Sequence, residues 1–250
     1  MINIAFVGNP NVGKTALINK ISNASLKMGN WPGVTIEKKE VFFKVGNEDV
    51  KLIDLPGIYN LSIGTPEERI SRNFILEEDV DVIINVVDST SLERNLYLTA
   101  LLKEMGKPMV MALNFEDEFK KLDYKLNLET LEKQLGMKAI FTSGRNGAGI
   151  DELMKEAVEA FKRNQTQKQI SYKLSFDNDI EKEIDSVKEK LSKLENKEIL
   201  KKYSLDWLAI KSLENDMNLF ANLKTKYGID ISDLAKEERE NLKKRYGIDS

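Results

Sequence analysis

The sequence contains no cysteine and no histidine among its 250 residues. Without cysteine the chain has no disulfide framework and no thiolate metal site. The absence of histidine removes the commonest transition-metal ligand and the usual general base of enzymes. Any chemistry must therefore come from oxygen ligands and from backbone groups.

Long hydrophobic runs and an excess of charge are also missing. No apolar run approaches the roughly 20 residues that a membrane-spanning helix needs. The N-terminus enters a strand-like pattern at once, so we expect no secretory signal. The net charge of −3 leaves no electrostatic footprint for nucleic acid or anionic lipid. We therefore expect a cytosolic type of globular protein, with one domain of about 160 residues and a smaller one.

The stretch around which the chain is organised has the pattern G-x-x-x-x-G-K-[ST]. It consists of Gly8, Asn9, Pro10, Asn11, Val12, Gly13, Lys14 and Thr15. An apolar run precedes it and a helical pattern that begins at Ala16 follows, which is the context of a phosphate-binding loop. The glycines let backbone N–H groups surround a diphosphate, while Lys14 reaches the β- and γ-phosphates and the Thr15 hydroxyl ligates Mg²⁺. The alternative is a glycine-bearing turn that happens to contain Lys-Thr, but the flanking strand and helix favour nucleotide binding.

Two further motifs would complete a triphosphate site. Asp54 and Gly57 end a predicted strand as D-x-x-G, so that Asp54 would hold the Mg²⁺ shell and the Gly57 N–H would meet a γ-phosphate. Thr35, which follows Gly33 and Val34, can give its hydroxyl to Mg²⁺ and its N–H to the γ-phosphate. That contact exists only with a triphosphate, so the loop is predicted to switch. A Trp-Pro-Gly turn packed on the sheet is the alternative interpretation of this loop.

Two polar loops after predicted strands would read the base. They hold Asn114, Phe115 and Asp117 in the first and Ser143, Gly144 and Arg145 in the second. The Asp117 carboxylate can accept from N1–H and the 2-amino group of guanine, a donor pair that adenine lacks. An N–H from the second loop would face guanine O6, and Asn114 would tie the first loop to the phosphate loop. Either loop alone would be an ordinary polar connection, but together they select guanine.

Strand and helix patterns alternate along the first part of the chain. This alternation predicts an α/β fold, with a mostly parallel six-stranded sheet and helices on both faces. The predicted strands cover residues 2–7, 36–45, 50–53, 80–87, 109–113 and 139–142. Helices are predicted over residues 16–21, 66–76, 91–105, 128–135 and 150–161. The segment 25–35, rich in glycine, asparagine and proline, is expected to form a loop.

A polar stretch over residues 163–169 has nothing to bury and marks the expected domain boundary. We therefore expect a P-loop domain over residues 1–164 and a small all-α domain over residues 165–250. Helices of the second domain are predicted over 177–194, 204–227 and 233–246. The small domain would either tune nucleotide exchange and relay the state of the switch loop, or serve as a passive spacer.

The five motifs, in this order and spacing, resemble those of the translation-factor-related GTPases over residues 2–162. Within that class, segments 8–15, 30–37 and 54–61 resemble the N-terminal cytosolic GTPase domain of the ferrous iron transport protein B (FeoB) family. The helical region from about residue 170 resembles the helical domain of that family in position and type, although no motif could be matched there. Two positions depart from the pattern: Phe115 stands where many relatives have lysine or methionine, and Gly144 replaces a usual alanine.

The resemblance implies a Ras-like GTPase that binds GTP or GDP with Mg²⁺ and hydrolyses GTP slowly. Asn11, Lys14, Thr35 and Gly57 would act in catalysis. Ile58 occupies the position of the water-orienting glutamine of Ras-like enzymes and cannot replace it. An asparagine at position 11 accompanies K⁺ coordination in a subset of such GTPases, where the cation stands in for an arginine finger. The alternative is a purely structural role, in which Asn11 only shapes its loop.

The resemblance also implies a place for the chain in the cell. It would be the cytosolic part of an Fe²⁺ transporter at the cytoplasmic face of the cell membrane, gating or driving uptake, with the transmembrane region outside this chain. A homo-oligomer is among the arrangements this allows. The rival class is a free-standing GTPase of ribosome assembly or tRNA modification, which usually carries a basic RNA-binding module that this slightly acidic chain lacks. A purely structural nucleotide-binding module is a third class.

Overall fold

The computed structural model describes residues 1–21, 26–61, 64–166, 176–194 and 198–247. The chain divides into two compact units. The first comprises Met1–Lys103 and Lys107–Tyr172, and the second Glu104–Gly106 and Lys173–Ser250. The boundary expected after residue 164 falls in the last turn of a helix that runs to Thr166.

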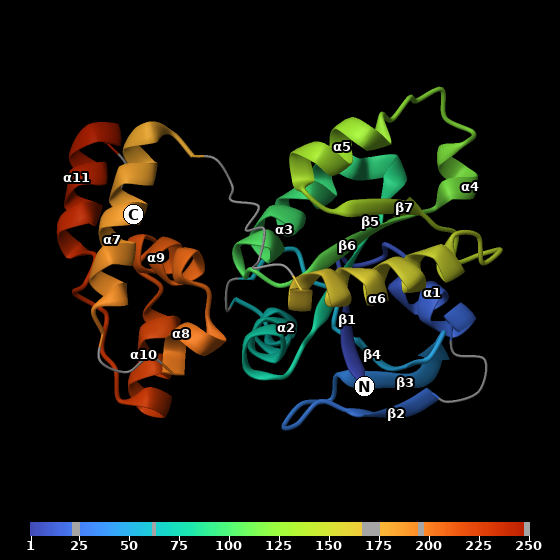
Figure 1. Ribbon diagram of the computed structural model, residues 1–250, viewed down its shortest axis with the longest axis horizontal. Helices are drawn as coiled ribbons and strands as arrows, with labels where there is room; N and C mark the ends of the chain where they lie inside the picture. The colour runs from blue at the N-terminus through green and yellow to red at the C-terminus, as the bar shows by residue number, and fades with distance from the viewer. Residues whose placement is uncertain (22–25, 62–63, 167–175, 195–197, 248–250) are drawn as a thin grey trace. The chain divides into compact units, whose positions relative to one another are not determined.

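The first unit is built on one seven-stranded sheet in the order β2-β3-β4-β1-β5-β6-β7 (Figure 1). The strands are β1 (Ile2–Gly8), β2 (Leu26–Asn30), β3 (Glu37–Val45), β4 (Glu48–Asp54), β5 (Val82–Asp88), β6 (Met109–Asn114) and β7 (Lys138–Phe141). Strands β4, β1, β5, β6 and β7 run parallel to one another, while β2 and β3 form antiparallel pairs at one edge. The parallel strands carry continuous apolar runs because both of their faces are covered.

Helices cover both faces of this sheet. They are α1 (Lys14–Ile21), α2 (Pro66–Glu77), α3 (Leu92–Glu104), α4 (Glu116–Phe119), α5 (Leu128–Leu135) and α6 (Ile150–Thr166). On one face, Leu17 and Ile18 of α1 and Leu153 of α6 join Ile4 and Phe6 of β1 in the core. Figure 1 shows α3 and α5 on the side of the sheet away from α6. The fold class predicted from the sequence is confirmed.

The predicted number of six strands was wrong, because segment 25–35 is not all loop. Strand β2 pairs antiparallel with β3, with Leu26 opposite Val41 and Asn30 opposite Glu37. Residues 27–30 are exposed and include glycine and asparagine, so they show no apolar alternation. The strand forms because the edge of β3 is free to pair with it. Such pairing is a tertiary effect that the local sequence does not encode.

The second unit is helical. Its helices are α7 (Asn178–Ser192), α8 (Glu198–Lys202), α9 (Leu205–Leu213), α10 (Met217–Tyr227) and α11 (Lys236–Tyr246). The single helix predicted over 204–227 was wrong, and α8 was missed. The chain breaks at Asn215, whose φ is 58°, and Asp216 then accepts the Leu219 N–H at 2.9 Å as the first cap of α10. Asparagine tolerates the left-handed conformation and aspartate caps a helix, so both residues favour a break.

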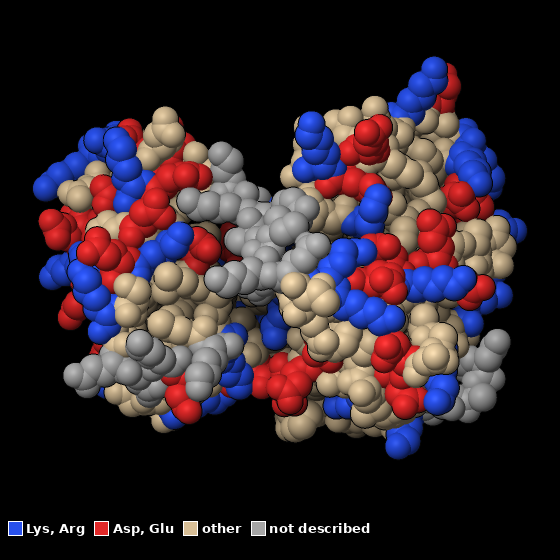
Figure 2. All heavy atoms as spheres, viewed as in Figure 1, with Lys and Arg blue, Asp and Glu red and all other residues tan. Residues whose placement is uncertain are grey.

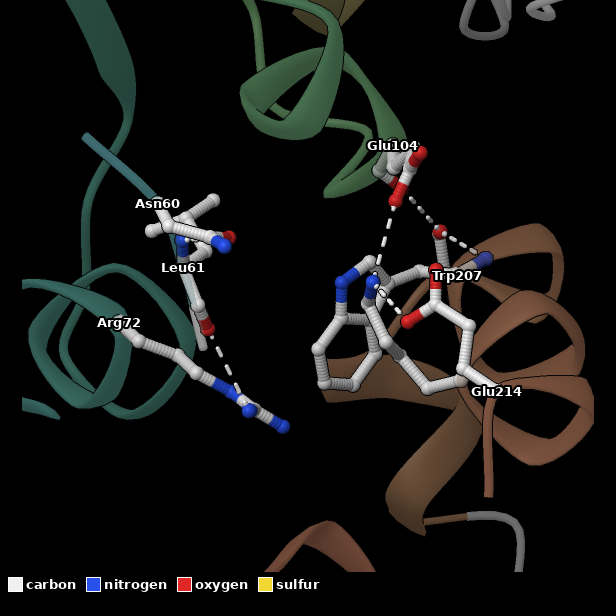
Figure 3. A network of polar contacts seen from close by, with 8 residues as sticks. Asn60, Leu61, Arg72, Glu104, Trp207 and Glu214 are labelled. Atoms are coloured by element: carbon white, nitrogen blue, oxygen red, sulfur yellow. Dashed lines mark hydrogen bonds and ion pairs between the residues drawn. The ribbon is translucent and has the colours of Figure 1, made fainter. Parts of the chain in front are cut away.

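Charged side chains of both signs are interspersed over the visible face of each unit (Figure 2). One charged cluster is largely buried in the second unit. Lys211 Nζ lies 3.4 Å from Glu104 Oε2 and 2.6 Å from Glu214 Oε2, contacts that are dashed in Figure 3. Ser204 Oγ donates to the Glu104 carbonyl at 3.2 Å. Residues 104–106 therefore belong to the packing of the helical unit.

Across the described part of the chain, every helix is too short or too polar to cross a membrane. In the first unit, strands β1, β4, β6 and β7 end at the same edge of the sheet, because they run parallel. The loops at the carboxyl ends of parallel strands are where such sheets bind ligands. All the motifs singled out in the first unit lie in or next to these loops, apart from the loop between β2 and β3.

Candidate nucleotide-binding site

The loop between β1 and α1 is shaped by close approaches that only glycine permits. Gly13 has a φ of 83°, and a Cβ added there would overlap the side-chain nitrogen of Asn114. A Cβ at Gly8 would overlap the Val86 carbonyl oxygen of β5. Asn11, between them, is exposed and also has a positive φ of 66°. The backbone thus turns sharply and lies directly on its neighbours.

Lys14 is folded back onto this loop. Its side chain is buried, and Nζ donates to the carbonyls of Gly8 at 3.2 Å and Asn9 at 3.5 Å. Burial lowers the pKa of Lys14, and the nearby Asp54 carboxylate only partly opposes this. An ammonium held in this way inside the loop favours binding of an anionic group, because the negative charge would compensate for the hydration that the ammonium has lost.

Asp54 has an unsatisfied acceptor beside Lys14. Burial raises the pKa of Asp54 to about 6, although Lys14 and Lys39 act in the opposite direction. Its Oδ1 atom is buried and has no hydrogen-bond partner among the described residues. A cation, or a water bound to one, would satisfy that oxygen. Asp54 therefore fits the predicted Mg²⁺ shell.

The D-x-x-G segment packs directly on the phosphate loop. A Cβ added at Gly57 would lie 3.0 Å from Pro10 Cα and 3.3 Å from Lys14 Nζ. The next residue, Ile58, donates its N–H to the Gly8 carbonyl at 3.2 Å. The Gly57 backbone is therefore placed beside the lysine that would hold the β- and γ-phosphates.

Asn114 joins three loops and is fully buried. Its Nδ2 donates to the Val12 carbonyl at 2.9 Å, which is the link to the phosphate loop that the sequence predicted. Its Oδ1 accepts from the Gly144 N–H at 3.1 Å and from Thr142 Oγ1 at 3.4 Å. The two loops that would read the base are thus fixed relative to the phosphates.

Asp117 presents an oriented carboxylate next to this junction. Ser143 Oγ donates to Asp117 Oδ1 at 2.8 Å, and Arg145 Nη1 lies 3.7 Å from Oδ2. The Ser143 hydrogen bond is the largest cause that lowers the pKa of Asp117, so the carboxylate is ionised at neutral pH. Phe115 has a φ of 66° and its ring lies over Gly13. The arrangement offers an ionised acceptor beside an apolar face.

Residues 2–157 match the family described as ferrous iron transport protein B, and residues 176–250 match the FeoB cytosolic helical domain. The chain belongs to the FeoB family. Both the family and the fold were therefore predicted correctly from the motifs. The matched family is one of ferrous iron transport proteins and not one of free-standing GTPases of RNA maturation.

Several FeoB proteins are similar to this chain. The Fe(2+) transport protein A/Fe(2+) transporter FeoB fusion protein of Porphyromonas gingivalis is 41% identical over 226 residues, covering 88% of this chain and 26% of that protein. The Fe(2+) transporter FeoB of Escherichia coli is 38% identical over 220 residues, covering 86% of this chain and 27% of that protein. The chain therefore spans about a quarter of the length of these relatives.

Solved FeoB structures resemble the whole chain. A mutant of S. thermophilus NFeoB bound to GDP matches with a TM-score of 0.87 at 34% identity, covering 100% of this chain and 92% of that chain. The cytosolic domain of the T. maritima FeoB iron transporter in its GMPPNP form gives a TM-score of 0.79 at 32% identity and covers 98% of each chain.

The other two predicted Mg²⁺ ligands differ from Asp54 in their exposure to solvent. The side chains of Thr15 and Thr35 are both exposed, and Thr35 lies in the loop between β2 and β3. Within the described ranges, no group of three or more acidic residues could form a metal cage. A divalent ion would therefore depend on hydroxyl, water and phosphate oxygens in addition to Asp54.

Two residues of the site were not predicted from the sequence. Ser89 Oγ donates to the Asn114 carbonyl at 2.6 Å, and Thr142 donates to the Asn114 side chain. Each is a hydroxyl residue directly after a buried strand, β5 or β7, at the edge where ligands bind. That position was the available signal, but it is common in α/β folds and names no partner.

Proposed function

We propose that this chain is a GTP-binding and GTP-hydrolysing domain that gates or drives Fe²⁺ uptake by a membrane transporter. The observation that carries the nucleotide part is the position of Asn114, which ties the loop of the ionised Asp117 to the phosphate loop. A carboxylate that is held in this way next to the phosphate loop suits the N1–H and 2-amino donors of guanine. The GDP- and GMPPNP-bound relatives support this choice of ligand.

The residues divide the work around the phosphates. Lys14 would neutralise charge on the β- and γ-phosphates, and the Gly57 N–H would meet the γ-phosphate. Thr15, Thr35 and Asp54 would hold Mg²⁺, which supplies positive charge to the phosphate oxygens when bound. In the second base loop a backbone N–H of residues 143–145 would donate to guanine O6, and the Gly144 N–H, which donates to Asn114, would have to share its hydrogen between Asn114 and the base if it is that donor.

Hydrolysis needs a further stabilising group, because the apolar side chain of Ile58 can neither orient water nor bear charge. We assign this role to K⁺ held by the side-chain carbonyl of Asn11 and by backbone carbonyls of residues 29–34. Asn11 is exposed on the phosphate loop, where its amide can turn toward a bound nucleotide. The cation would stabilise charge that develops between the β- and γ-phosphates.

The transport part of the proposal comes from the relatives. They are Fe(2+) transporters, and this chain spans about a quarter of their length. The chain would therefore lie at the cytoplasmic face of the membrane and connect to a transmembrane region. The domain over residues 165–250 would either relay the nucleotide state between the two or serve as a passive spacer.

The exchange of Asp117 for asparagine tests the base assignment. Asp117→Asn replaces an acceptor by an amide that also donates, so we expect GTP affinity to fall at least about 30-fold while XTP binds comparatively better. Calorimetric titration with GTP, ATP and XTP measures this. Asp123→Asn, an exposed carboxylate of the same loop, is the matched control and should keep the preference for GTP. An unchanged preference in Asp117→Asn would overturn the assignment.

The same pair of variants tests transport in the full-length protein. Fe²⁺ uptake by iron-starved cells should be lost with Asp117→Asn and kept with Asp123→Asn. Equal uptake by both variants would separate nucleotide binding from iron transport and refute that half of the proposal.

A further inference from the structure

Trp31 anchors the loop that carries Thr35. The Trp31 side chain is only 6% exposed, whereas Pro32 and Thr35 are exposed. The Trp31 N–H donates to the Ile36 carbonyl at 2.9 Å and closes the base of the loop, and the Val34 N–H donates to the Trp31 carbonyl at 3.2 Å. The buried indole is the fixed end of an exposed loop.

The indole packs against helix α2. The ring centroids of Trp31 and Phe74 lie 5.2 Å apart at an angle of 78°, an edge-to-face contact. Lys38 of β3 places Nζ 4.9 Å from the Trp31 centroid and 5.7 Å from that of Phe74. Glu40 lies 2.9 Å from the same ammonium and holds it there. One cluster therefore joins the Thr35 loop, β3 and α2.

Helix α2 also holds the segment around Gly57. Ser71 Oγ donates to the Pro56 carbonyl at 3.4 Å. Arg72 Nη1 donates to the Leu61 carbonyl at 3.4 Å, and Figure 3 shows these two residues facing each other. Helix α2 is thus in contact with both loops that would meet the γ-phosphate.

The buried position of the Trp31 indole leaves its Nε1–H group without a hydrogen-bond acceptor among the described residues. Buried donors are almost always paired, and an unpaired one disfavours the conformation that buries it. Ring packing therefore holds the indole in place, while its N–H favours any movement toward water or an acceptor. The buried position of the indole is therefore one that the side chain can leave at low cost.

We propose that Trp31, Phe74 and Lys38 form a latch that holds the loop in the position in which Thr35 is exposed, and that binding of a nucleoside triphosphate releases it. The inference rests on the proposed function, in which Thr35 meets Mg²⁺ and the γ-phosphate. Release takes the indole off α2, so the helix that holds the Gly57 segment responds to the same event. Trp31 acts here as a positioning residue.

A weaker latch should favour the triphosphate state. Phe74→Leu removes the edge-to-face contact, so we expect the affinity for a non-hydrolysable GTP analogue to rise about two- to tenfold, with GDP affinity unchanged. Phe42→Leu is the matched control, because Phe42 is an aromatic residue of β3 that contacts Lys27 and Lys51 instead. It should change neither affinity. An unchanged or lower triphosphate affinity in Phe74→Leu would overturn the latch.

Fluorescence of Trp31 follows the release directly. The chain has two tryptophans, so Trp207→Phe leaves Trp31 as the sole emitter. With Mg²⁺ and the GTP analogue its emission should shift to the red and acrylamide quenching should increase, whereas GDP should leave both unchanged. If that variant fails to fold, the difference between the wild-type and Trp31→Phe chains gives the same signal.

The outcomes separate the latch from the proposed function. Calorimetric binding of the GTP analogue with no change in Trp31 emission or quenching would overturn the latch and leave the proposed function standing. Failure of both GDP and the analogue to bind would overturn the proposed function and the latch together.

Discussion

Gly13 shows how much of the site depends on one missing side chain. Its φ of 83° is unfavourable for any other residue, and its Cα faces the side-chain nitrogen of Asn114. The same nitrogen makes the 2.9 Å bond to Val12 that ties the base-reading loop to the phosphate loop. A side chain at this position would therefore act on the phosphates and on the base loop at once.

Gly13→Ala should abolish detectable nucleotide binding and destabilise the first unit. The left-handed conformation costs a non-glycine residue about 1–2 kcal/mol, and the clash with Asn114 adds to it. Gly46→Ala is the matched control, because Gly46 has a φ of 59° with open space around its Cα. That variant should show the conformational cost alone and bind GDP normally. Calorimetry and denaturant unfolding measure both effects, and retained GDP binding in Gly13→Ala would contradict the prediction.

Asn11 offers a test of the cation hypothesis at the same scale. We expect kcat for GTP hydrolysis to rise when K⁺ replaces Na⁺ at constant ionic strength, because a cation at Asn11 would stabilise the developing charge. Asn11→Gly should remove this gain and keep GDP binding, since glycine retains the φ of 66° without strain. Asn47→Ala, in the hairpin turn, is a control that should keep the gain. Equal rates in K⁺ and Na⁺ would refute the hypothesis.

The sequence predicts such residues when their partners follow from a motif. The role of Asn114 could be inferred because its motif and the phosphate loop lie at one edge of a parallel sheet. Ser89 and Trp31 could not be assigned in the same way. Each depends on one contact between distant segments, Ser89 with the Asn114 carbonyl and Trp31 with Phe74, and no local pattern encodes either contact.

At the scale of elements, the boundary between α9 and α10 shows the same limit. Apolar residues recur at helical spacing on both sides of Asn215, and this periodicity predicts one continuous helix. The chain turns because Asn215 takes a left-handed conformation and Asp216 caps the next helix. The signals for the break were in the sequence, but helical periodicity outweighed them.

Helices α7 and α11 are joined by a buried carboxylate. Glu238 is 2% exposed, with Lys190 Nζ at 2.6 Å and Ser186 Oγ at 2.6 Å from its Oε1. Burial raises the pKa of Glu238, but the hydrogen bonds from Lys190 and Ser186 outweigh it and hold the pKa below the ordinary value. The ionised form therefore stabilises the helical unit above the pKa of the unfolded chain, and this stabilisation is lost as the pH falls through the folded pKa.

Glu238→Gln should destabilise the second unit by about 1–2 kcal/mol at neutral pH, because a neutral amide replaces a charged acceptor. The difference from the wild type should shrink at a pH below the lowered folded pKa of Glu238, where the wild-type carboxyl is protonated as well. Denaturant unfolding followed by Trp207 fluorescence at both pH values measures this. Glu237→Gln is the control, since Glu237 is exposed and lies 3.8 Å from the same lysine. A difference that does not depend on pH would contradict the prediction.

At the scale of the whole molecule, each unit has a core of its own. The sheet packs around residues such as Phe6 and Ile84, and the helical unit around Trp207 and Leu223. The α/β class of the first part and the helical class of the second could be predicted from motifs and hydrophobic patterns. The three-residue contribution of segment 104–106 to the helical unit could not, because it depends on contacts with residues about a hundred positions later.

We expect two separable unfolding transitions, one reported by Trp31 and the other by Trp207. GDP at about 100 times its Kd should stabilise the first by about 2.7 kcal/mol, because it binds only the folded site. The transition of Trp207 should not move if the helical unit is a spacer with an independent core, which is the outcome we expect. The single-tryptophan variants Trp207→Phe and Trp31→Phe resolve the two signals. A shift of the Trp207 transition with GDP would instead support a relay of the nucleotide state.

The place of Glu104–Gly106 in the second unit has a consequence for biosynthesis. The ribosome makes these residues long before it makes Ser204, which lies 100 positions later and donates to the Glu104 carbonyl. The helices of the second unit can begin to associate as they emerge, but Lys211 meets Glu104 only if the end of α3 is still accessible at that moment. Completion of the helical unit is therefore a late step of synthesis that depends on how the earlier part of the chain has already folded.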